Sequence, residues 1–163
     1  MTRKQILAMV RKLIADEQAT GFTDGGNLEQ PEGTQELLNY LDRAVDEYSK
    51  RQAAAGDVRL MKETNVSNNS SLPDDFLKFC GMIPLKIIGK KVKLYVGSTV
   101  SARYLARLPY VTSYSDNDEL PYENDQSITV AAMAAIYALN KQDFNVSQHL
   151  LLLGYGAGEN AAS

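Results

Sequence analysis

Apolar residues recur at helical spacing in the first third of the chain. In residues 2–20 they form one stripe, and Thr2 and Gln5 have the spacing of a capping box. Residues 34–55 carry a second stripe, formed by Leu37, Leu38, Leu41, Val45 and Tyr48. The pattern therefore predicts two amphipathic helices, joined by the glycine-rich, acidic loop "TDGGNLEQPEG".

The period changes between residues 57 and 108. "VRLMKET" alternates weakly, as an edge strand would, and the polar "NVSNNSS" follows as a loop. After the turn "LPDDF", three segments are typical of strands: "MIPLKII", "KKVKLYV" and "SARYLARL". Gly89 and Gly97 separate them, where tight turns are needed. We expect a small antiparallel β-meander at about 57–108.

The last third returns to helical patterns. Pro121 suits the first turn of a helix over 121–140, whose many alanines allow close approach on nearly every side. A short helix is expected over 144–153 and a flexible tail over 154–163. The predicted fold class is α+β, mainly α: a helical bundle with an inserted small antiparallel β-meander and a flexible C-terminal tail.

Composition and charge narrow the classes of protein. A chain of 163 residues is usually one domain, here predicted over 1–153. The formal net charge of −3 argues against nucleic-acid binding as the main task. Cys80 is the single cysteine, which fits folding in a reducing cytoplasm. No apolar stretch approaches the roughly 20 residues that cross a bilayer. We expect a soluble intracellular protein.

Candidate catalytic chemistry is sparse. His149 is the single histidine and lacks an accompanying serine elbow, so a surface or interface position is favoured. Cys80 is interpreted as a small buried hydrophobe. The acids Asp74 and Asp75 follow a proline, where carboxylates serve as caps. A small enzyme would need these acids, or those at 116–125, gathered in a pocket. The prediction is no enzyme, with no catalytic residue.

Neither a metal site nor a cofactor site is predicted. "DNDE" at 116–119 lacks the glycine and the closing glutamate of a calcium loop. "GYGAG" near the C-terminus follows a predicted helix rather than a strand, so it fails as a nucleotide motif.

Basic residues gather in the predicted meander, and three interpretations stay open. On paired strands they would form one positive strip, with Tyr95 and Tyr104 interleaved, as in single-strand binders. Alternatively, lysines on an exposed hairpin protect edges from aggregation, which the acidic whole-chain balance favours. Thirdly, they would contact an acidic patch on a neighbouring copy. The residues in these predicted inter-subunit charge contacts are Lys90, Lys91, Lys93, Arg103, Arg107, Asp116, Asp118 and Glu119.

The order of these elements resembles the head–tail adaptor (connector or neck) proteins of tailed bacteriophages. The resemblance runs from the first helix to Leu153 and is strongest in four segments: "LPDDF" (72–76), "VKLYV" (92–96), "RYLARLP" (103–109) and "LPYENDQSITVAAMAAIYAL" (120–139).

The resemblance implies a structural protein of the virion. Such adaptors form a ring, usually dodecameric, under the portal protein and present a platform for a tail or nozzle protein. DNA passes through the ring without specific binding. The implied location is the virion neck, after assembly in the host cytoplasm. Portal docking is expected at Leu150, Leu151, Leu152, Leu153 and Tyr155. The alternatives are another phage tail or neck component, or a nucleic-acid-binding protein that uses the basic hairpin.

Overall fold

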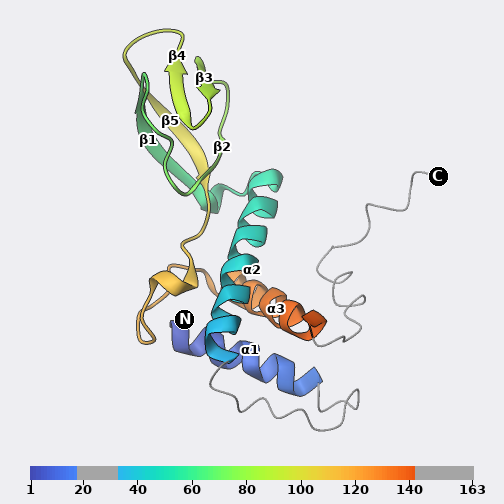
Figure 1. Cartoon of the computed structure of the whole chain (residues 1–163). Helices are drawn as coiled ribbons and strands as arrows, with labels where there is room; N and C mark the ends of the chain where they lie inside the picture. The colour runs from blue at the N-terminus through green and yellow to red at the C-terminus, as the bar shows by residue number, and fades with distance from the viewer. Residues whose placement is uncertain (18–32, 142–163) are drawn as a thin grey trace, which may run out of the picture. The chain divides into compact units, whose positions relative to one another are not determined.

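The computed structural model describes residues 1–17 and 33–141, and these form a mixed α+β protein with a small antiparallel β region (Figure 1). The α+β prediction is confirmed. The helices and strands are α1 (Arg3–Glu17), α2 (Gly33–Ala55), β1 (Met61–Ser67), β2 (Phe76–Phe79), β3 (Leu85–Ile88), β4 (Lys91–Leu94), β5 (Thr99–Ala106) and α3 (Asn124–Lys141), with short 3-10 helices at Val58–Leu60 and Val111–Ser113. The helix predicted at 144–153 and the tail at 154–163 lie outside the described residues.

The chain divides into two compact units. Of the described residues, the helical unit combines residues 1–17, 33–44 and 110–141, and the β unit is Val45–Pro109. One boundary falls inside α2 and the other falls at Pro109, just after β5.

In the helical unit, α1 packs against α3. The first half of α2 adds hydrogen bonds, from the Arg11 guanidinium to Thr34 Oγ1 at 2.6 Å and from the Thr112 N–H to Asp42 Oδ1 at 3.3 Å. The predicted capping box is confirmed, because the Thr2 N–H donates to Gln5 Oε1 at 2.8 Å and the Gln5 N–H to Thr2 Oγ1 at 3.2 Å. Ile6 and Val10 are fully buried on the predicted stripe of α1. From α2, the Arg43 guanidinium lies 4.4 Å from the centre of the Tyr137 ring on α3.

The start of α3 differs from the prediction. Pro121 is not in the first turn, since the helix begins at Asn124. The side chain of Gln126 accepts a hydrogen bond from the Glu123 N–H at 2.9 Å, and Glu123 C=O accepts the first helical bond, from Ser127 N–H. Glu123 is therefore the N-cap residue. The expected burial on nearly every side is confirmed, because Val130, Ala131, Met133, Ala135 and Ile136, which lie on different sides of the helix, are all buried.

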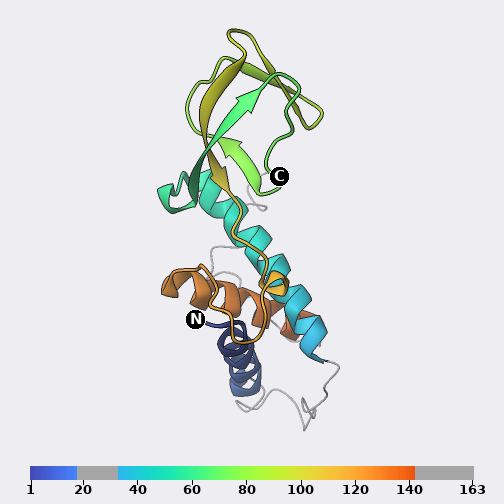
Figure 2. The same ribbon diagram turned by 90° about the vertical axis from the view of Figure 1, so that its left-hand side faces the viewer.

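The strand order of the β unit differs from a meander. β5 lies between β1 and β2 in one antiparallel sheet, and β3 pairs with β4 in a second (Figures 1 and 2). β1 continues to Ser67, through part of the predicted polar loop, because β5 is long enough to pair with all seven of its residues. β2 was not predicted: it has four residues, a bulge between Phe76 and Lys78, and no clean alternation.

Both turn glycines predicted in the β unit are confirmed. Gly89 has φ of 62° and Gly97 has φ of 77°, a left-handed conformation that costs other residues more. Between them, Val92 and Leu94 of β4 point inward, and Lys91 and Lys93 point outward. Val92 and Leu94 share a buried cluster with Val66 of β1 and Ala102 of β5.

Candidate interaction surface

The β3–β4 hairpin presents one charged face to solvent. Its register places Leu85 opposite Leu94, Lys86 opposite Lys93, Ile87 opposite Val92, and Ile88 opposite Lys91. Residues directly opposite each other in an antiparallel pair share a face, and successive residues alternate between faces. The Tyr95 N–H continues the ladder with a 3.0 Å bond to Pro84 C=O. We call the outward side chains Lys86, Ile88, Lys91, Lys93 and Tyr95 the lysine face.

The lysine face is exposed, and its lysines have no ion-pair partner in the part of the chain that the structure describes. All five of its side chains are exposed, with Tyr95 at 66% and Ile88 at 55%. Lys90, in the turn beside Gly89, is exposed as well. Among residues 1–17 and 33–141, none of these four lysines forms an ion pair. Lys86 and Lys93 stand directly opposite each other, an arrangement of like charges that destabilises a strand pair.

Edge protection does not account for three of these four lysines. β4 is paired on both sides: with β3, and with the segment that follows β1. Asn69 N–H donates to Val92 C=O at 2.8 Å, Val92 N–H to Ser70 C=O at 3.0 Å, and Leu72 N–H to Lys90 C=O at 3.2 Å. Lysines on an edge strand, whose backbone groups are unpaired, prevent it from pairing with a strand of another chain. Within the hairpin that role suits Lys86 on β3 and leaves the lysines at 90, 91 and 93 unexplained.

Charge is unevenly distributed along the chain. The β unit, Val45–Pro109, contains eleven Lys and Arg against six Asp and Glu, a formal charge of +5. The rest of the chain contains six against fourteen, a formal charge of −8, and the two add to the −3 of the whole chain. Residues 76–115 contain seven basic residues and no acid. The negative net charge of the whole chain therefore does not show that the β unit has a net positive charge.

The predicted positive strip across paired strands is not formed. It required the strands that carry Lys91 and Arg103 to be neighbours, but β5 pairs with β1 and β2 rather than with β4. Arg103 is exposed on β5 opposite Glu63. Arg107 is half-buried, and its guanidinium lies 3.7 Å from the Asp46 carboxylate. Lys86 lies on the same face as Lys93 but is not among the charge-contact residues predicted from the sequence. A count of charges segment by segment would have indicated it.

The acidic residues of the predicted charge contacts lie in the helical unit, and two of them already interact with residues of their own chain. Asp116 pairs with the Arg3 guanidinium at 2.7 Å. The Asp118 carboxylate accepts from the Ser115 N–H at 2.6 Å. The backbone of this loop also holds the N-terminus, through an isolated bridge between Thr2 and Glu119. Whether these acids also contact a second copy stays a prediction.

Asp74 is exposed and Asp75 is half-buried, and the Asp75 carboxylate contacts side chains of two strands. Asp75 Oδ2 pairs with Lys62 at 2.6 Å, and its Oδ1 accepts from the Tyr104 hydroxyl at 3.1 Å. Burial raises the pKa of Tyr104 to about 12, and the hydrogen bond to Asp75 adds to this shift. Tyr104 also stacks on Phe76 at 5.8 Å between ring centroids. Asp75 therefore fixes the "LPDDF" turn on β1 and β5.

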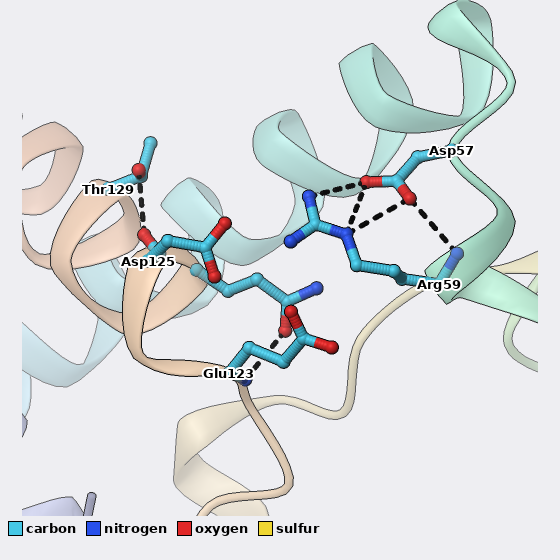
Figure 3. Close-up of polar contacts among 6 residues, drawn as sticks. Asp57, Arg59, Glu123, Asp125 and Thr129 are labelled. Atoms are coloured by element: carbon cyan, nitrogen blue, oxygen red, sulfur yellow. Dashed lines mark hydrogen bonds and ion pairs between the residues drawn. The ribbon is translucent and has the colours of Figure 1, made fainter.

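Two further polar clusters have structural roles, each in its own unit (Figure 3). In the β unit, Asp57 caps the 3-10 helix, accepting from the Arg59 backbone N–H at 3.0 Å and from its guanidinium at 2.7 Å. The side-chain bond from Arg59 lowers the pKa of Asp57, with burial opposing it. In the helical unit, the Thr129 hydroxyl donates to Asp125 C=O at 2.8 Å inside α3.

Of the remaining candidate residues, Cys80 lies in the described part of the chain. Cys80 is half-buried, and its N–H donates to Arg103 C=O at 2.8 Å, beside β2 and β5. His149 and the portal-docking candidates Leu150, Leu151, Leu152, Leu153 and Tyr155 lie outside the described residues. In the described part of the chain, no three His, Cys, Asp or Glu side chains are grouped so as to hold a metal ion. No helix there is long and apolar enough to cross a membrane.

Comparison with known proteins gives no relative: no family model, no curated protein and no solved structure matches the chain.

Proposed function

We propose that this chain is a structural protein of tailed-phage virions, a head-to-tail adaptor that forms a ring under the portal. In this role it joins the capsid to the tail and leaves a channel for DNA. The proposal includes a bundle of α1, α2, α3 and a last helix at 144–153. It also includes a location in the neck, between capsid and tail.

The element order carries the proposal. Two helices are followed by a β unit, then by an alanine-rich helix, and this is the order on which the resemblance rests. Three segments of the resemblance fall at the start, in the middle or at the end of a strand: "LPDDF" ends at the first residue of β2, "VKLYV" contains β4 from Val92 to Leu94, and "RYLARLP" contains the end of β5. Such segments determine the fold of the subunit rather than a catalytic site, which suits a protein whose function is to bind other proteins through its surfaces.

Portal capture tests the proposal. Native mass spectrometry of the purified chain with a portal ring should show several copies bound, whereas the chain alone is expected to be a monomer. Deletion of residues 154–163 should leave the chain folded and abolish capture, because the predicted docking tail is gone. Tyr155→Ala should weaken capture by about tenfold if the tyrosine side chain inserts into a pocket of the portal protein.

The control is Tyr95→Ala, which removes an exposed tyrosine from the β unit. Its capture should equal that of the unaltered chain. If the deletion variant binds as well as the full chain, the docking-tail model is wrong. If the full chain itself is not captured, the adaptor proposal fails.

A further inference from the structure

The lysine face has the properties of a surface for a polyanion. Four lysines, the three of the lysine face and Lys90, lie on one hairpin whose two strands have four residues each, with no acid between residues 76 and 115. Lys91 and Lys93 are two residues apart on one strand, about 6.6 Å, and Lys93 is about 5 Å from Lys86 across the pair. A ligand with closely spaced negative charges would neutralise all of them and remove the repulsion between Lys86 and Lys93.

Residue type favours phosphate over a protein carboxylate surface. Lysine is depleted in protein–protein interfaces, where arginine and aromatic residues are enriched. Phosphate backbones are bound by lysine as a point charge, and duplex DNA carries one negative charge per about 1.7 Å of its axis. The acidic loop of a second copy is a weaker candidate, because Asp116 and Asp118 already have partners within their own chain.

We propose that the lysine face, together with Lys90, binds the sugar–phosphate backbone of double-stranded DNA without reading base sequence. The contact is electrostatic and local, so the acidity of the rest of the chain does not forbid it: charges more than about 8 Å away are largely screened at physiological salt. This proposal does not depend on the adaptor function.

Fluorescence anisotropy with a labelled duplex of mixed sequence tests it on the full chain. Four phosphate contacts predict a slope of about −3.6 for log affinity against log salt. Affinity should therefore fall roughly 100-fold between about 50 mM and about 200 mM salt. A second duplex of unrelated sequence should bind equally, since backbone contacts carry no sequence information.

Matched variants locate the contact. Lys91→Gln/Lys93→Gln removes two charges from the lysine face and should halve the salt slope, to about −1.8. Lys4→Gln/Lys12→Gln removes two exposed lysines from α1, giving the same net charge, and should leave the slope unchanged. Circular dichroism should show both variants folded, because all four side chains are exposed.

Three outcomes would overturn the proposal. The first is no duplex binding by the full chain at about 50 mM salt. The second is an equal loss of binding in both double variants, which would indicate a general charge effect. The third is self-association by sedimentation that needs Lys91 and Lys93, without duplex binding; the partner would then be a second copy.

Discussion

At the scale of single residues, hydrogen-bond satisfaction decides what a buried polar group contributes. Ser49 and Ser127 are both fully buried in helices. Ser49 Oγ accepts from the Leu108 backbone N–H at 3.1 Å, and so ties α2 to the end of the β5 segment within the β unit. Ser127 Oγ finds no hydrogen-bond partner among the described residues. The two serines therefore form a natural matched pair.

We expect Ser49→Ala to lower the free energy of unfolding by about 1–3 kcal/mol, because it leaves the buried Leu108 N–H unsatisfied. Ser127→Ala should be neutral or stabilising by about 0.5 kcal/mol, since it removes an unsatisfied hydroxyl and favours the helix. Urea denaturation followed by circular dichroism measures both. Equal effects would show that the Ser49–Leu108 bond contributes little.

The Asp57–Arg59 contact predicts a pH dependence. The side-chain hydrogen bond from Arg59 holds the pKa of Asp57 below its usual value in the folded chain. Its stabilising contribution is therefore present above the unfolded value and is lost as the pH falls through the folded value. Asp57→Asn should lower the unfolding free energy by about 0.5 kcal/mol near neutral pH.

That difference should be smaller at acid pH than near neutral pH, because it is lost as the pH falls through the folded pKa of Asp57. Thermal midpoints at the two pH values measure it. The control Asp74→Asn removes an exposed acid that immediately precedes Asp75 and should change the midpoint little. A difference between Asp57→Asn and the unaltered chain that grows on acidification would contradict this account.

At the scale of elements, the inner face of the β3–β4 hairpin stabilises the fold, whereas its outer face lowers stability. Val92 and Leu94 are buried, and Gly89 supplies the turn. The opposed pair of Lys86 and Lys93 works against these favourable features. A hairpin that retains such a pair gives up stability, as binding surfaces commonly do.

Lys93→Glu should raise the unfolding free energy by about 0.5–1 kcal/mol, because it places opposite charges across the strand pair. Lys90→Glu makes the same charge change in the turn, without a cross-strand partner, and should leave stability within about 0.5 kcal/mol. Thermal denaturation at low salt measures both. If the two variants are equally stabilised, the gain reflects net charge rather than the pair. Duplex binding by Lys93→Glu should fall as its stability rises.

At the scale of the whole molecule, the separation of charge between the two units changes what the composition means. A net charge of −3 argues against nucleic-acid binding only if the charge is spread evenly. Here the β unit carries +5 and the rest of the chain −8. The net charge of the β unit therefore supports a nucleic-acid contact that the net charge of the whole chain disfavoured. This contact and the adaptor proposal are compatible, since backbone binding is not specific binding.

The sequence by itself determined the elements whose signals are local. Helical periodicity located α1 and α2, a capping box located the start of α1, and glycines located the turns around β4. It also determined the inward and outward faces of β4, because alternation of side chains is a property of a single strand.

Only the tertiary structure decided which strands are neighbours and which charges meet. β2 is too short to be recognised until β5 pairs with it, and β1 extends to Ser67 because β5 provides a partner. α3 starts at Asn124 because Gln126 caps Glu123 rather than pointing into solvent. Lys86 joins Lys93 while Arg103 and Arg107 lie apart from them, since strand pairing brings together residues distant in sequence. Pairing of this kind depends on long-range contacts, and a local pattern does not encode them.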